Sequence, residues 1–301
     1  MQRIGLLFLG LFVSGNRPIQ AQEAAGTTLW RVAAATLPTP TALALGPAAA
    51  LWNPAQRSDS ARVIVAVEAI QTPAAVDATG IITTVRLPAS KIGELGLIYG
   101  RVGLSDISQT GDSPDPSGAS VPVYTFAVGA TWARRLAGTD VGATLAFHET
   151  RLDTQRGDRV TFDVGASRAF SGDLLRIAAA THFLSSLSVD DPAQDIYAGL
   201  EARVWQGAVS RERAVLRGRY GIAFAHGFTA DHQLGLGIEF AKVFSFDFMV
   251  AHEGSYGNDS GWRPVAGARI VIGKYNLTLA RDGGVNDIGA AYRVGIDARL
   301  K

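Results

Sequence analysis

Histidines and acidic side chains are the residues of this sequence whose types could carry chemistry. His148 and His182 fall on the polar face of predicted strands, and the other three histidines lie near loops. None has a second ligand at the spacing of a metal site. Asp106, Asp112 and Asp115 share one long loop but lack the ligand order of an EF-hand, so we expect a solvated loop. Because no Gly-x-Ser-x-Gly nucleophile motif occurs either, the sequence predicts no metal, no cofactor and no enzyme.

A larger set of charged residues recurs at every second position of apolar-rich segments. Period-two spacing places such residues on one face of a β-strand. We expect that face to line the inside of a barrel, where arginines and acids form a lattice of ion pairs that stiffens the wall. The candidate lumen-lining residues are Arg176, Glu201, Arg203, Arg217, Arg219, Glu239, Asp247, Arg269, Arg293, Asp297 and Arg299.

The stretch 233–250 shows the element that must position these charges. Its even positions are large and apolar, as at Leu234 and Phe246, whereas its odd positions are mostly small or charged, as at Glu239 and Asp247. Only three residues, 241–243, interrupt the alternation. Two strands joined by so short a connection form an antiparallel hairpin with one apolar and one polar face.

The same unit repeats along most of the chain. Read by alternation alone, residues 61–301 contain about fourteen strands, each close to the 9–11 residues that a tilted strand needs to cross a bilayer. The connections alternate between short turns, such as Gly273-Lys274, and longer loops, of which 104–122 is the longest. Outer-membrane barrels show this asymmetry, and an even strand number returns both termini to the periplasm. The predicted fold is therefore all-β, an antiparallel transmembrane β-barrel.

The distribution of charge indicates which face of the barrel meets lipid. Charged residues in mid-strand fall almost wholly on the face that carries Gly, Thr and Ser, and an arginine on the lipid face at mid-membrane costs about 2–4 kcal/mol. Arg101 and Arg168 break the pattern, but both lie near predicted strand ends, where arginine can snorkel. The alternative is a soluble lipocalin-like barrel with the apolar face inside, which suits about eight strands rather than fourteen.

The N-terminus of the 301-residue chain resembles an export signal. Residues 1–21 combine Arg3, an apolar run over 4–13 and a small residue, Ala21, at the expected cleavage site. We therefore predict export to the outer membrane of a Gram-negative-type bacterium. The signal holds two of the 28 basic residues and none of the 27 acids, so the mature chain has a net charge of −1 and no nucleic-acid partner is expected. Cysteine is absent, which excludes disulfides and a lipoprotein anchor.

Residues 22–60 do not alternate and form a separate N-terminal segment. Ala48 to Trp52 favour one or two helical turns, and Asn53 before Pro54 is displaced from the helical region. Apolar Leu51 and Trp52 suit a plug inside the barrel; the alternative is a flexible periplasmic tail. The candidate plug residues are Leu51, Trp52, Asn53, Pro54 and Ala55.

The run Leu51-Trp52-Asn53-Pro54-Ala55, just ahead of the first strand, resembles the hatch of FadL-type outer-membrane channels and the corresponding element of the related PorV and PorQ proteins. The resemblance implies a fourteen-stranded barrel plugged by this hatch. It also implies an inward kink in the third strand that opens the wall laterally. Here that strand holds Gly93, Gly96 and Gly100, and strand glycines often mark a bulge. The alternative is a lumen face that is simply built from small residues.

Two classes of function follow from the resemblance. FadL-type channels imply passage of small apolar solutes across the outer membrane, so the partners would be outer-membrane lipid and a hydrophobic solute. PorV- and PorQ-like proteins imply a barrel that transports nothing and docks with secretion-system proteins. The short chain and modest loops lean towards the second class, whereas the hatch motif serves both.

Overall fold

The computed structural model describes most of the chain beyond the predicted signal segment, which lies outside the described residues. The described residues are 25–46, 48–58, 61–73, 76–88, 90–104, 107–110, 116–185, 195–209, 211–225, 230–252, 261–284 and 289–300.

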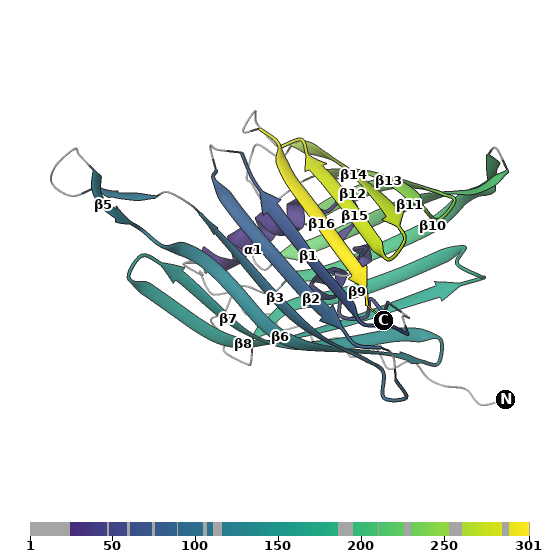
Figure 1. Ribbon diagram of the computed structural model, residues 1–301, viewed down its shortest axis with the longest axis horizontal. Helices are drawn as coiled ribbons and strands as arrows, with labels where there is room; N and C mark the ends of the chain where they lie inside the picture. The colour runs from purple at the N-terminus through teal and green to yellow at the C-terminus, as the bar shows by residue number, and fades with distance from the viewer. Residues whose placement is uncertain are drawn as a thin grey trace.

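Fourteen antiparallel strands close into a barrel within the described residues, which confirms the predicted fold class (Figure 1). Each strand pairs with its neighbour in sequence, and β1 pairs with β16 to close the ring. The strands are β1 (Ile64–Gln71), β2 (Ala78–Arg86), β3 (Glu94–Leu104), β6 (Val123–Leu136), β7 (Thr139–Leu152), β8 (Gln155–Phe170), β9 (Leu175–Ser185), β10 (Asp195–Val209), β11 (Glu212–Ala225), β12 (Asp231–Phe240), β13 (Phe244–His252), β14 (Trp262–Ile272), β15 (Tyr275–Asp282) and β16 (Ala291–Arg299).

The alternation of residue types sets the two faces of the wall. In β13, Phe244, Phe246 and Phe248 are exposed on the outside, while Ser245 and Asp247 are buried on the inside. Successive side chains of a strand point to opposite faces of the sheet. A period of two in the sequence therefore places the apolar side chains outside and the polar ones inside. The inside of this barrel is therefore its polar side, opposite to a soluble lipocalin-like barrel.

The two ends of the barrel differ. One end carries most of the short connections, such as Ala137-Gly138 and Gly273-Lys274, together with the C-terminus and the start of β1 (Figure 1). The two-residue turn between β7 and β8, Asp153-Thr154, lies at the opposite end. The other end carries the longest connection, between β3 and β6, which holds a small two-stranded sheet of β4 (Ser108–Thr110) and β5 (Pro116–Ser120). This sheet projects away from the ring and was not expected from the sequence.

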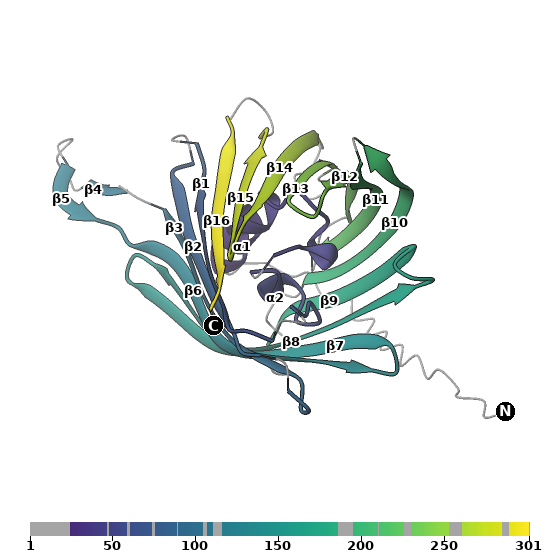
Figure 2. The ribbon, with the colours of Figure 1, turned by 45° about the vertical axis from the view of Figure 1, so that its right-hand side comes forward.

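The N-terminal segment lies inside the ring (Figure 2). It contains α1 (Ala25–Ala35), the 3-10 helix η1 (Thr41–Leu43) and the single turn α2 (Ala49–Trp52), and we call its described residues, 25–46 and 48–58, the hatch. None of these helices is long and apolar enough to span a membrane. The helical turn expected over 48–52 is present as α2, whereas α1 was not predicted.

Strand β3 pairs in continuous register with β2 and with β6, so the ladder has no bulge at Gly96 or Gly100. The inward kink that the resemblance implies stays a prediction. Gly100 faces the lumen, where a Cβ would lie 2.5 Å from the ring of Trp30 in α1. The register shifts of the wall occur in β8, at Phe162/Val164, and in β10, at Arg203/Trp205.

Candidate functional site

The turn after α2 is the centre of the buried hatch. Asn53 fixes it: its Nδ2 donates to the Ala42 carbonyl oxygen at 2.8 Å, and its Oδ1 accepts from the Ala55 amide at 3.0 Å. Leu51, Trp52 and Asn53 are at most 2 % exposed. An asparagine side chain that replaces backbone partners in this way holds a tight turn. The five residues that the sequence singled out as a plug are all buried within the lumen.

Two aromatic contacts join the hatch to lumen histidines. The Trp52 ring lies 5.4 Å from the His182 ring and 6.5 Å from Trp30, and Trp30 lies 6.5 Å from His148, between ring centroids. Both histidines are buried among these rings. They therefore pack the hatch against β7 and β9. No group of three or more metal-ligating side chains occurs in the described part of the chain.

Six glycines line the wall at places where the hatch comes close to it, and we call them the wall glycines. A Cβ at Gly142 would lie 2.2 Å from the Pro54 carbonyl oxygen, and one at Gly165 would lie 2.1 Å from Asn53 Oδ1. Real Cβ atoms do not approach so closely, so only glycine permits these contacts. The wall glycines are Gly100, Gly142, Gly165, Gly199, Gly221 and Gly267, which meet Trp30, Pro54, Asn53, Leu43, Pro40 and Pro38 respectively.

Arginines of the wall hold the C-terminal end of α1. Arg293 donates from Nη2 to the Ala33 carbonyl oxygen at 2.5 Å and from Nε to Thr36 Oγ1 at 2.9 Å, and its Nη1 pairs with Glu68 at 2.5 Å. A cation is favourable here because the last carbonyl groups of a helix lack partners and carry partial negative charge.

Arg263 acts at the same helix end from the neighbouring part of the wall. Its Nη1 donates to the Ala35 carbonyl oxygen at 2.7 Å and pairs with Asp282 at 2.8 Å. Two buried guanidinium groups thus bind carbonyl oxygens of α1, each balanced by a wall carboxylate. The sequence analysis placed Arg293 on the lumen face but did not single out Arg263.

Acidic residues hold the other end of the hatch near the short turns. Glu94 accepts from the Ser58 amide at 2.9 Å and from its hydroxyl at 2.7 Å, and it also pairs with Arg86 at 3.2 Å. Arg57 pairs with Asp140 at 3.1 Å. The hatch is therefore attached to the wall at two places, residues 33–36 and residues 57–58.

Four of the predicted lumen charges, on β10, β11 and β13, meet in one network. Glu201 accepts from Arg219 Nε at 2.6 Å and from Arg217 Nη1 at 3.4 Å, and Arg219 also pairs with Asp247. Arg176 lies across from Glu201 on β9. These ion pairs link strands of the wall directly to one another, without a hatch residue between them.

The other candidate lumen residues do not join this network. Arg203 donates to Gln206 at 2.9 Å, Asp297 accepts from Asn276 at 2.8 Å, and Arg293 binds α1 as described. The candidates that are buried are Glu201, Arg219, Asp247, Arg293 and Asp297; Arg176, Arg203, Arg217, Glu239 and Arg269 are half-buried, and Arg299 is exposed at the end of β16.

A small cavity lies between the hatch and the wall. A cavity of about 50 Å³ lies between Leu37, Pro38 and Leu45 of the hatch and Arg269 of the wall. This volume holds a few water molecules, whereas small-molecule sites typically measure about 300–1,000 Å³. A drug-sized solute therefore does not fit in this cavity.

The contacts of α1 are the part of the site that sequence reasoning missed. Trp30 and Ala33 are buried against the wall, and Arg31 pairs with Asp195 at 3.5 Å. A run of good helix formers over 29–35, ended by Pro38, was a usable signal.

A closed antiparallel ring that encloses its own N-terminal segment defines a plugged β-barrel. Among solved structures it is similar to the toluene transporter TodX of P. putida, with a TM-score of 0.52, 10% sequence identity, and coverage of 85% of this chain and 94% of TodX. It is also similar to the outer membrane protein Omp33 of Acinetobacter baumannii, with a TM-score of 0.48, 10% identity, and coverage of 81% and 100%. At such identities the likeness concerns the fold alone. The sequence matches no known family profile and no curated protein.

Proposed function

We propose that this chain is a channel of the bacterial outer membrane for small apolar solutes, and that the hatch is its plug. The observation that carries the proposal is the fit between the hatch and the wall glycines. The wall lacks side chains at the positions that meet the hatch, so its shape is complementary to the hatch. Export directed by residues 1–21 would bring the chain to the outer membrane.

The outer surface of the barrel supports the membrane placement. Large apolar side chains are exposed all around the ring, including Leu97 on β3, Leu145 on β7, Val204 on β10 and Leu279 on β15. A soluble protein rarely exposes apolar patches of that extent, whereas a barrel in lipid requires an apolar band. Outer-membrane lipid is accordingly the first partner of this chain.

The apolar solute class has two supports. One is the resemblance of Leu51-Trp52-Asn53-Pro54-Ala55 to the FadL-type hatch, and the other is the fold shared with TodX, which is a toluene transporter. The cavity of about 50 Å³ beside the hatch is too small for such a solute. Passage therefore needs the hatch to shift within the lumen.

Deletion of residues 23–58 tests the plug. In planar lipid bilayers the shortened barrel should show a higher single-channel conductance than the full-length protein, because the hatch no longer fills the lumen. Uptake by a Gram-negative host that lacks its own transporter tests the solute class. A long-chain fatty acid should enter faster with the full-length chain, and a small sugar should not. Unchanged conductance together with no fatty-acid uptake would overturn the proposal.

A docking role in a secretion system is the second candidate. The hatch is attached to the wall at two places, by Arg293 and Arg263 near residue 35 and by Glu94 and Asp140 at residues 57–58, which favours a lumen that stays closed. Copurification of secretion-system proteins with the full-length barrel, combined with no uptake, would support this role.

A further inference from the structure

A groove on the outer face of the barrel lies beside the long connection between β3 and β6, and we call it the outer groove. Its volume is about 490 Å³. Thr79, Gly103 and Tyr124 form one row across β2, β3 and β6, and Ile81 and Arg101 belong to the next row. Because Gly103 has no side chain, the row is hollow between Thr79 and Tyr124.

Arg101 is the charged residue of the outer groove. It is exposed on the outward face, between Ile81 on β2 and Phe126 on β6, and its guanidinium carbon lies 4.7 Å from the centroid of the Tyr124 ring. It forms no ion pair with any described residue. A guanidinium on an apolar outer face needs an anionic or polar partner from outside the protein.

The carboxylate next to the outer groove is already engaged. Glu149 accepts from the Tyr124 hydroxyl at 2.8 Å and pairs with Arg156 at 2.6 Å. Arg151 is the register partner of Tyr124 on β7 and is exposed. The acidic residues Glu149 and Asp158 are register partners across β7 and β8, outside the lining of the outer groove, so the charged side chain that lines the groove is that of Arg101.

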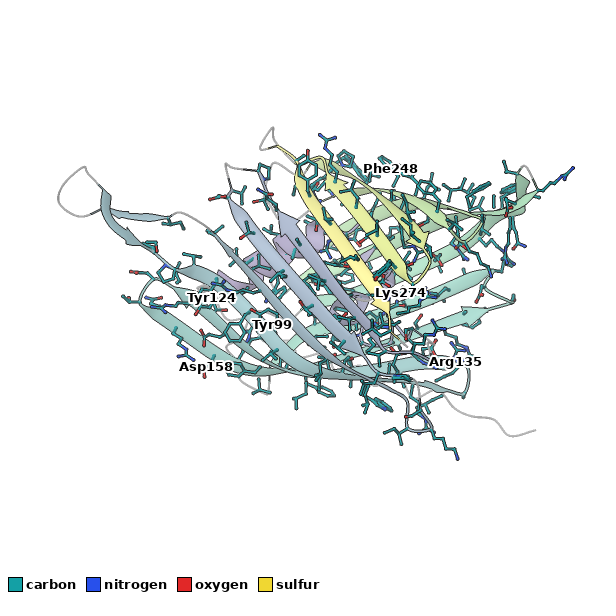
Figure 3. The ribbon with its side chains drawn as sticks, viewed as in Figure 1. Tyr99, Tyr124, Arg135, Asp158, Phe248 and Lys274 are labelled. Atoms are coloured by element: carbon teal, nitrogen blue, oxygen red, sulfur yellow. The ribbon has the colours of Figure 1, made fainter. Side chains whose placement is uncertain are left out.

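Aromatic residues mark the level of the outer groove on the barrel wall. Tyr99 and Tyr124 lie on the same outer face, and Tyr99 is exposed one outward position below Arg101 on β3 (Figure 3). Aromatic girdles and snorkelling arginines are placed where the hydrocarbon core meets the headgroups. Arg101 thus lies where lipid phosphates are found.

We propose that the outer groove binds a phosphorylated glycolipid of the outer leaflet. The Arg101 guanidinium donates to a phosphate group, and an acyl chain lies along Ile81 and Tyr99. Arginine suits this role because its planar fork binds two phosphate oxygens at once. The inference rests on the membrane placement proposed above, but it does not require the barrel to conduct.

Titration of the intact, hatch-containing protein in detergent with lipid A, followed by native mass spectrometry, tests the site. The variant Arg101→Gln should bind lipid A about tenfold more weakly, since a hydrogen bond to a charged group contributes about 1.5–3 kcal/mol. Arg101→Lys keeps the charge but loses the fork, so its affinity should fall between the two. Arg281→Gln is the matched control, because Arg281 is also exposed at the end of its strand but lies on β15, away from the groove.

Three outcomes would overturn the site: equal loss in the Arg101 and Arg281 variants, phosphatidylcholine bound as tightly as lipid A, or displacement of lipid A by inorganic phosphate. The last would mean that a free phosphate, rather than a lipid, is the ligand. Far-UV circular dichroism of each variant shows whether the barrel is intact. Because the assay measures no transport, its failure leaves the channel proposal unaffected, and failed uptake leaves this site unaffected.

Discussion

At the scale of single residues, the lumen wall combines positions without a side chain and positions with a buried charge. Gly142 and Gly165 receive the backbone and side chain of the Asn53-Pro54 turn, while Arg293 and Glu68 form an ion pair beneath α1. The two kinds of position act together. The glycines let the hatch approach, and the charged groups satisfy the polar groups that the hatch brings with it.

The first prediction compares two lumen glycines. Gly142→Ala should lower the free energy of unfolding by about 1–3 kcal/mol, because the added Cβ overpacks against the Pro54 backbone. Gly235→Ala is the matched control, since its Cβ would meet Phe248 O at an ordinary 3.4 Å. Urea unfolding in detergent measures both. Equal effects would mean that the hatch does not rest on Gly142.

The second prediction concerns the Arg293–Glu68 pair. Arg293→Gln leaves Glu68 buried without its partner, and loss of one member of a buried pair costs about 3–5 kcal/mol. Adding Glu68→Gln removes the unpaired charge, so the double variant should regain much of that stability. A double variant as unstable as Arg293→Gln would assign the whole effect to the contacts with α1 instead.

Alternation in the sequence predicts which charged residues face inward, but not which residues they pair with. Period-two spacing is local, so it assigned Arg219, Asp247 and Arg293 to the inward face, where they lie. The partner of Arg293 is Glu68, 225 residues away, and that pairing depends on closure of the ring between β1 and β16. No local pattern contains it. The same limit applies to Gly100. The residue that requires a glycine at this position is Trp30, which lies on a separate element, α1.

At the scale of elements, the hatch is the part of the fold that alternation could not describe. The Asn53-Pro54 turn carries strong local signals and was predicted, whereas α1 depends on its packing against β3, β6 and β7. The bulge in β10 likewise follows from pairing with β11: it turns both Val204 and Trp205 outward, where alternation alone predicts one of them. Tertiary contacts decide such features, and a single sequence does not display them.

The third prediction tests whether the hatch moves. The chain has no cysteine, so the pair Leu43→Cys and Gly199→Cys would form the only disulfide. A Cβ at position 199 would lie 2.7 Å from Leu43 Cγ, which brings the two sulfur atoms within bonding reach. The oxidised double variant should fail to take up fatty acid and recover with reductant, whereas each single variant should not respond. Equal uptake before and after reduction would show that η1 stays in place during passage.

At the scale of the whole molecule, the fold separates an apolar outside from a charged inside. Leu236 and Phe248 face each other across β12 and β13 on the outside, and Glu201 and Arg219 do so across β10 and β11 on the inside. Most of the short turns share one end with the C-terminus, and the longest loops lie at the other. On the proposed function, this asymmetry predicts that the long loops face the outside of the cell.

The fourth prediction tests that orientation with a membrane-impermeant thiol reagent. Asp158→Cys, at the end with the long loops, should react in intact cells, and Lys274→Cys, in a short turn at the other end, should react only after the outer membrane is permeabilised (Figure 3). Phe248→Cys should stay unlabelled in both states because lipid covers it. Ready labelling of Phe248→Cys in membranes would contradict the transmembrane placement.

The pairing of the first strand with the last also constrains the order of assembly. Ile64 to Gln71 of β1 pair with Arg299 to Tyr292 of β16, so the ring is complete only when the C-terminal strand has been delivered. The hatch directly precedes β1 in the chain, and β1 is one of the two strands that close the ring. Closure of β1 on β16 therefore has to leave the hatch on the inside, where the wall glycines give it room. A ring that closed with the hatch outside would leave the space beside these glycines empty.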